Sequence, residues 1–152
     1  MSSKVSVLNR QDRVPVDRRK IGAAARRILK TLGYEGYELT VVLVDDREIT
    51  RLNRQYFRRN RPTNVISFPM MDGSSVSLRA RMLGDVVISA ETAKRDAEEV
   101  GKKGEDEILF LLIHGILHLV GFDHEETKKE RLRMETKERE LFFLLKKSPS
   151  RR

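Results

Sequence analysis

The sequence predicts an α+β domain, with a small mixed β-sheet of about four strands packed with about five helices. Three observations lead to this fold class. Short runs rich in β-branched residues recur through the first part of the chain, and amphipathic segments separate some of them. The later part carries helical patterns only. Strands followed by a group of helices are typical of a sheet that collects its helices against it.

The first strand and helix have clear boundary signals. Residues 5–7 alternate as a short strand, and residues 10–16 form a charged loop. Asp17 is expected to cap a helix whose apolar residues recur on one face as far as Leu32. Gly33 follows as the stop signal.

A second strand at residues 38–44 leads into a helix with an arginine stripe. Asp45 is the expected cap of this helix, with Glu48 three residues later as in a capping box. The predicted apolar face consists of Ile49, Leu52 and Tyr56. The arginines recur at helical spacing and continue past the helix end: Arg47, Arg51, Arg54, Arg58, Arg59 and Arg61.

Two more strands are expected at residues 63–69 and 83–89, and the short loop between them favours antiparallel pairing. Ser89 is the predicted cap of the next helix, which ends at Gly101. The apolar positions of that helix are Ala93, Ala97 and Val100.

The last helix is predicted over residues 125–147, and its inner face is marked by Met134, Leu141 and Leu145. Residues 148–152 are expected to form a disordered basic tail. The sequence therefore predicts one domain, residues 1–147.

Composition narrows the class of function. The chain has 31 Lys and Arg against 23 Asp and Glu, a net charge of +8, so nucleic acid is a plausible partner. A solvated, ion-paired surface, as in heat-adapted proteins, explains the same charge. The absence of cysteine excludes a disulfide framework, and no signal-peptide pattern is present. We expect a cytoplasmic protein without a membrane partner, because the apolar run 108–120 is too short to span a bilayer.

All three histidines of the chain lie in HGILHLVGFDH, residues 114–124. Residues four apart on a helix differ by about 40° in direction and ~6 Å in rise, so His114 and His118 can face one point. His124 can join them only if the chain reverses, and Gly121 stands where a left-handed glycine would end the helix. Three converging imidazoles predict a metal site with an open coordination position.

Zinc is the metal that this ligand set favours, although imidazole also suits nickel and other divalent transition metals. A metal with an open position activates water at neutral pH and polarises a carbonyl or phosphoryl oxygen. The predicted chemistry is therefore hydrolysis.

The spacing of the histidines also matches the metzincin peptidases, HExxHxxGxxH, so a metallopeptidase is one alternative. Those enzymes place their general base directly after the first histidine, whereas this chain has Gly115 there. The glycine either leaves space beside the metal or allows close packing against a neighbouring element. The general base stays unidentified.

Three segments in this order, LNRQYFRRNRPTNVISFP, LGDVVIS and HGILHLVGFDH, resemble the YbeY family of bacterial metal-dependent endoribonucleases. That family acts in ribosomal RNA maturation and ribosome quality control. The resemblance implies an α+β fold, one zinc ion bound by His114, His118 and His124, and cleavage of single-stranded RNA in the cytoplasm near the small ribosomal subunit.

The chain departs from the family at Phe57, where an arginine commonly follows the tyrosine. Arg58 is the candidate to grip the scissile phosphate instead, and a solvated helix end explains it equally well. Arg51, Arg54, Arg59 and Arg61 are the candidates for RNA binding.

Asp85 and Asp123 are candidates to orient a ligand imidazole. A second alternative to the nuclease is a non-catalytic module in which zinc is structural and the basic surface binds ribosomal RNA.

Overall fold

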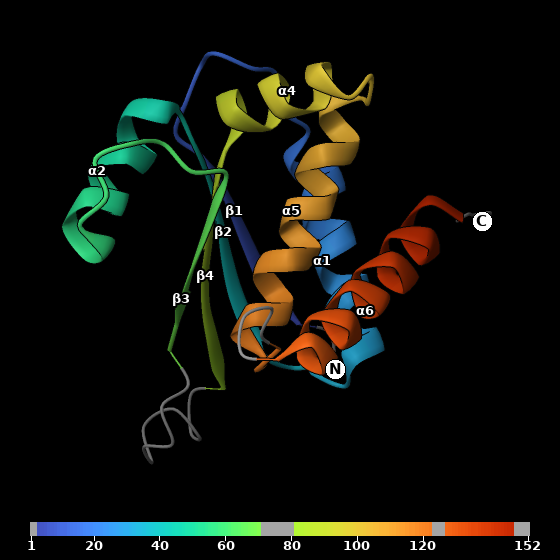
Figure 1. The fold of residues 1–152 in the computed structure, drawn as a ribbon. Coiled ribbons are helices and arrows are strands. Elements are labelled where there is room, and N and C mark those ends of the chain that lie inside the picture. The colour runs from blue at the N-terminus through green and yellow to red at the C-terminus, as the bar shows by residue number, and fades with distance from the viewer. Residues whose placement is uncertain (1–2, 71–80, 123–126, 148–152) are drawn as a thin grey trace.

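A four-stranded mixed sheet divides the molecule, and helices pack on both of its faces (Figure 1). The structure is a computed structural model, and it describes residues 3–70, 81–122 and 127–147. The strands are β1 (Lys4–Asn9), β2 (Glu38–Val44), β3 (Val65–Pro69) and β4 (Met82–Ser89). The helices are α1 (Arg18–Leu32), α2 (Asp46–Phe57), α4 (Ala90–Glu99), α5 (Gly104–Leu119) and α6 (Lys128–Lys147). The predicted α+β class is confirmed.

The strand order is β1-β2-β4-β3. The pairs β1–β2 and β2–β4 are parallel. Helix α1 returns the chain to the starting end of the sheet between β1 and β2, and the oppositely directed β3 does so between β2 and β4. The pair β3–β4 is antiparallel, as predicted, with Val65 opposite Ile88 and Pro69 opposite Gly84. Strand β3 is consequently an edge strand.

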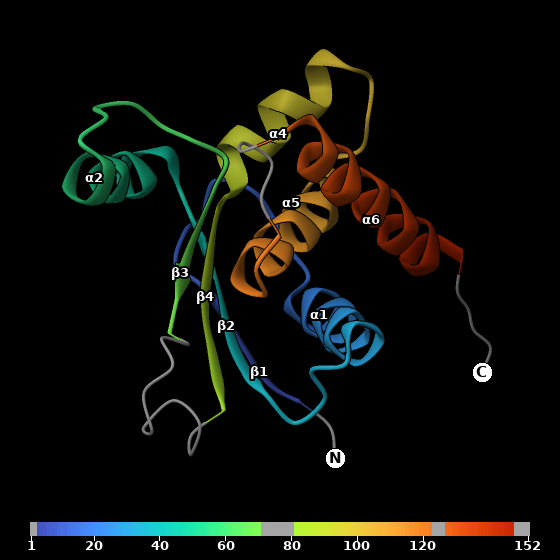
Figure 2. The ribbon, with the colours of Figure 1, turned by 60° about the horizontal axis from the view of Figure 1, so that its bottom comes forward.

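The two faces of the sheet are covered unequally (Figures 1 and 2). Helices α1, α5 and α6 lie on one side, and their apolar residues join those of the strands in the larger core. Helix α2 lies alone on the opposite side, where the core is small. This second core contains Val44, Ile49, Ile66 and Val87.

Strand β3 contributes side chains to both faces of the sheet, because successive side chains of a strand point to opposite sides. Val65 packs against the core beneath α5, whereas Ile66 and Phe68 pack in the core beneath α2. Ser67 points toward α5, since its hydroxyl donates to the Gly115 carbonyl at 2.8 Å.

The predicted caps of α1 are in place. The Asp17 carboxylate accepts from the Lys20 N–H at 3.1 Å, and Gly33 ends the helix with φ of 88°. Helix α4 likewise begins at Ser89, whose hydroxyl accepts from the Thr92 N–H. The assignment of Val100 to the apolar face was wrong: α4 ends at Glu99, and Val100 is 72% exposed.

Helix α2 also corrects one prediction. Asp45 caps it as expected, and Ile49 is fully buried, but Tyr56 is 55% exposed. Asn53 takes the buried place instead and donates to the Arg61 carbonyl at 2.9 Å. The segment after α2 is thereby held against the helix.

The remaining predictions concern the end of the chain. Helix α6 is described from Lys128, so residues 125 and 126 of the predicted helix lie outside the described residues. The predicted tail, residues 148–152, also lies outside them. No helix in the described ranges is long and apolar enough to cross a membrane.

Candidate metal centre and arginine groove

Helix α5 brings His114 and His118 together one turn apart. Their Nε2 atoms are 3.2 Å apart, and their ring centroids are 4.6 Å apart. Two nitrogens that bind one tetrahedral Zn²⁺ at about 2.0–2.1 Å lie roughly 3.3 Å from each other, so the pair fits a shared ion. Both rings are partly exposed, whereas the neighbouring Ile113 and Leu117 are fully buried.

The third predicted ligand, His124, lies outside the described residues, as does Asp123. Within the described ranges, no group of three potential ligands gathers to hold a metal ion. The glycine helix end predicted at Gly121 is nevertheless present. Gly121 has φ of 102°, and the Phe122 N–H donates to the Leu117 carbonyl at 2.9 Å. This is the hydrogen bond of a Schellman helix end.

Glu138 of α6 contacts His114 directly. One Glu138 carboxylate oxygen lies 2.5 Å from His114 Nδ1, and Glu138 is only 3% exposed. A carboxylate in this place accepts a hydrogen bond from Nδ1–H, and in that tautomer the Nε2 lone pair is directed toward His118. Glu138 therefore fixes the orientation and tautomer that a metal ligand requires.

Glu138 was not among the residues predicted from the sequence. The signal was present, since Glu138 falls four residues after Met134 and three before Leu141, on the buried stripe of α6. A carboxylate at a buried position needs a partner, and an unexplained charge on an apolar helix face predicts one.

Asp85 does not orient a histidine, so that prediction was wrong. It lies on β4 directly before Val86, which belongs to the core beneath α5, and its side chain takes the other face of the sheet. There it lines a groove beside α2.

Gly115 allows close packing between α5 and the sheet. A Cβ atom at this position would lie 2.6 Å from Val86 Cγ1 and 3.2 Å from Ser67 Oγ. Of the two explanations offered above, packing is therefore confirmed. The peptidase glutamate has no room at this position.

A groove of about 1200 Å³ lies between α2 and the exposed face of the sheet. Four arginines line it: Arg10, Arg47, Arg51 and Arg54. Arg10 was not predicted to belong here, because it follows β1 and reaches the groove only through the order of the strands. Tyr56 and Phe68 line the same groove, with ring centroids 5.1 Å apart.

The predicted arginines occupy different settings. Arg51 is paired with Glu48 at 2.6 Å, and Arg54 donates to Asn60 at 2.8 Å. Arg58 ends α2 with φ of 59°. Arg59 and Arg61 are exposed in the following segment. Arg51 and Arg54 line the groove beside α2, on the face of the sheet opposite the histidines of α5.

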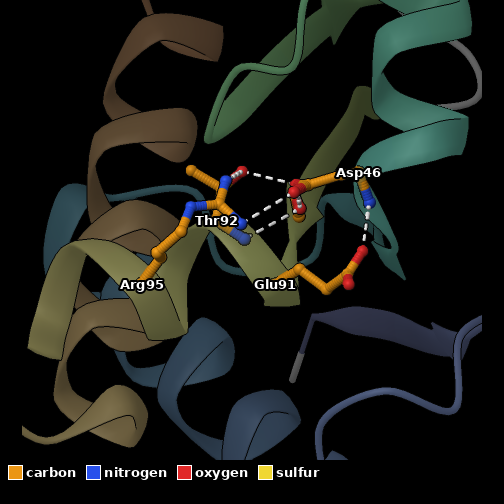
Figure 3. Close-up of polar contacts among 5 residues, drawn as sticks. Asp46, Glu91, Thr92 and Arg95 are labelled. Atoms are coloured by element: carbon orange, nitrogen blue, oxygen red, sulfur yellow. Dashed lines mark hydrogen bonds and ion pairs between the residues drawn. The ribbon is translucent and has the colours of Figure 1, made fainter.

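A polar cluster anchors α2 at its first residue (Figure 3). Asp46 accepts hydrogen bonds from Ser89 at 2.7 Å and Thr92 at 2.5 Å, and it pairs with Arg95 at 2.9 Å. Its own N–H donates to Glu91 at 2.8 Å. Burial tends to raise the pKa of Asp46, but these hydrogen bonds and the guanidinium outweigh it and lower the pKa below its ordinary value.

Residues 6–146 match the family model described as endoribonuclease YbeY. The endoribonuclease YbeY of Geobacter metallireducens is 50% identical over 145 residues, covering 95% of this chain and 97% of the relative. That of Geobacter sulfurreducens is 50% identical over 143 residues, covering 93% and 95%.

Among solved structures, the chain is similar to the solution structure of TM1509 from Thermotoga maritima. The TM-score is 0.61 and the sequence identity 25%, and the match covers 97% of this chain and 99% of TM1509. The likeness extends over the whole fold described above.

Proposed function

Because the chain belongs to the endoribonuclease YbeY family, we propose that it cleaves single-stranded RNA with one zinc ion, in the maturation of ribosomal RNA. The family membership confirms the resemblance inferred from the sequence to metal-dependent endoribonucleases, and with it the assignment as a hydrolytic nuclease. We propose zinc as the ion and single-stranded RNA as the preferred substrate.

The main support for the metal site is the pair of Nε2 atoms of His114 and His118, which lie 3.2 Å apart. The buried Glu138 carboxylate contacts the other nitrogen of the His114 ring. In the proposal His114, His118 and His124 hold the ion. When bound, zinc supplies the Lewis acidity that activates water and polarises a phosphoryl oxygen. Glu138 holds the His114 ring in the tautomer that binds metal, and helix α5 spaces the first two ligands.

RNA binding is assigned to the arginines of the α2 side. Arg51 and Arg54 in the groove, with Arg59 and Arg61 beyond it, are proposed to bind phosphates along the strand. Because His114 and His118 lie on the other side of the sheet, a strand bound to the arginines reaches them by passing around the edge strand β3. Arg58 is proposed to meet the scissile phosphate on this path.

The proposed partner is ribosomal RNA at the small ribosomal subunit, and the proposed compartment is the cytoplasm. The net charge of +8 supports an RNA partner, since arginines release counterions from a phosphate backbone on binding. The affinity for RNA should consequently fall steeply with salt.

The test combines metal analysis with RNA cleavage. Wild-type protein should contain about one zinc per chain and cleave a single-stranded ribosomal RNA fragment faster than its duplex. His114→Ala, His118→Ala and His124→Ala should each lose metal and cleavage while keeping the fold by circular dichroism. Thr136→Ala, at an exposed position of α6, is the control and should change neither. Undiminished cleavage in the histidine variants would overturn the proposal.

The alternatives have less support. A metallopeptidase lacks its base, because Val86 occupies the space next to Gly115. A non-catalytic module in which zinc is structural predicts that chelation unfolds the chain. In the proposed enzyme, chelation removes cleavage and leaves the folded helices in place.

A further inference from the structure

The groove beside α2 contains more than arginines. Tyr56 is 55% exposed, and its ring meets that of Phe68 at an interplanar angle of 68°. Phe68 lies directly opposite Asp85 in the antiparallel pair β3–β4, on the same face of the sheet. Two aromatic rings and one carboxylate therefore line the same stretch of the groove.

The placement of Asp85 has no structural explanation on this face. Its neighbours in the groove include the apolar Val42, Val87 and Phe68, and burial raises the pKa of its carboxyl above the ordinary value. Among the described residues, no hydrogen bond or ion pair holds this carboxylate. A half-buried acid in an arginine-lined groove is poised to accept from a ligand that enters there.

The occupant follows from the chemistry of the groove. Exposed aromatic rings beside arginines are typical of sites that bind single-stranded nucleic acid, where the bases stack and the guanidinium groups hold phosphates. An ionised carboxylate accepts hydrogen bonds and donates none. Guanine is the base whose Watson–Crick edge offers two adjacent donors, N1–H and N2–H, whereas cytosine, adenine and uracil place an acceptor beside the donor.

We propose that this groove binds one unpaired guanine of the RNA substrate, stacked on Tyr56 with its edge against Phe68, and with its N1–H and N2–H groups donating to Asp85. This inference rests on the proposed function, since it assumes an RNA substrate. It adds a base preference at one position, away from the histidines and on the other side of the sheet. The bound guanine fixes the register in which the strand passes around β3.

The test measures binding of labelled twelve-nucleotide RNAs by fluorescence anisotropy to the full chain. Each RNA is oligo(U) with a single central G, A or C, and oligo(U) alone is the reference. Wild-type protein should bind the G-containing RNA at least about tenfold more tightly than the others, as a bidentate base contact allows. Asp85→Asn should abolish this difference while retaining the uniform, salt-dependent affinity for RNA.

Two further variants separate stacking from overall charge. Tyr56→Ala should weaken binding of the G-containing RNA about fivefold or more, and Tyr56→Phe, which keeps the ring, should restore most of it. The controls are Phe143→Ala, an exposed aromatic of α6, and Glu99→Gln, an exposed carboxylate of α4. Neither should alter the base preference.

His114→Ala distinguishes this inference from the proposed function, because it should lose cleavage and keep the guanine preference. If the wild-type chain binds the G-containing RNA selectively but cleaves no RNA, the proposed function is wrong and the guanine site is still supported. Equal affinity for all four RNAs, with cleavage intact, would overturn the guanine site alone. Unchanged affinity for the G-containing RNA in both Tyr56→Ala and Asp85→Asn would also overturn the guanine site. The groove would then be a candidate surface for a protein partner.

Discussion

The carboxylate of Glu138 and the imidazole of His114 join α6 to α5 through a contact of 2.5 Å between Oε2 and Nδ1. This contact links the last helix of the fold to the proposed metal centre. Glu138 is only 3% exposed, so burying its carboxylate costs desolvation free energy. The hydrogen bond with the imidazole offsets part of that cost. Its position behind the proposed ligand is consistent with a role at the metal site as well as in packing.

Glu138→Gln should lower the affinity for zinc about 10- to 100-fold, because the amide is a weaker acceptor and no longer fixes the His114 ring. Competition with a chromophoric chelator measures this affinity without reference to cleavage. Glu140→Gln, at an exposed position on the same helix, is the matched control. Equal zinc affinities for wild type and Glu138→Gln would show that the contact supports packing only.

Gly115→Ala should destabilise the fold. The added methyl would lie 2.6 Å from Cγ1 of Val86, which is fully buried and has little room to move. Overpacking of this kind costs about 1–3 kcal/mol, which exceeds the gain of about 1 kcal/mol from replacing a helical glycine by alanine.

Urea denaturation of a double-mutant cycle checks this prediction. Val86→Ala alone should destabilise through a cavity, and the pair Gly115→Ala with Val86→Ala should be more stable than the sum of the two effects predicts. A Gly115→Ala protein more stable than wild type would contradict the packing explanation.

The residues around His114 show which parts of the site can be predicted from the sequence and which cannot. The spacing of His114 and His118 predicts their meeting, because helical geometry is local and regular. The caps at Asp17 and Ser89 were predicted for the same reason. Glu138 reaches His114 across 24 positions of sequence, and that contact depends on how α6 packs.

The arrangement of the groove could not be predicted from local sequence patterns either. Which face of β4 carries Asp85 depends on the sheet order β1-β2-β4-β3, and the separation of the arginines from the histidines depends on α2 packing opposite α5. A period of two predicts that neighbouring strand residues face opposite sides, but it does not say which helix covers each side.

Asp46→Asn should loosen α2, since this residue supplies the carboxylate that accepts from Ser89 and Thr92 and pairs with Arg95 (Figure 3). Hydrogen exchange should accelerate in residues 46–57 more than in α5, because few buried residues hold α2 otherwise. Glu98→Gln, which breaks an exposed pair with Lys94, is the control and should leave exchange unchanged.

The pH dependence gives the same prediction a second measurement. The folded-state pKa of Asp46 is lowered, so its contribution to stability is fully present above the ordinary value of 3.8 and is lost as the pH falls through the folded-state pKa. The stability difference between wild type and Asp46→Asn should therefore be larger at pH 7 than at pH 2. A difference independent of pH would contradict an ionic anchor.

Arg58→Gly should separate stability from activity at the end of α2. Arg58 has φ of 59°, a left-handed conformation that glycine adopts without the penalty of a side chain. The variant should gain about 1 kcal/mol in the free energy of unfolding, measured in urea. If Arg58 meets the scissile phosphate, Arg58→Gly should also lower kcat for single-stranded RNA, and Arg58→Lys, which keeps a positive charge, should lower it less. A more stable protein with wild-type kcat would mean that Arg58 serves only as the helix end, and that the role left open by Phe57 falls to Arg59 or is absent from this chain.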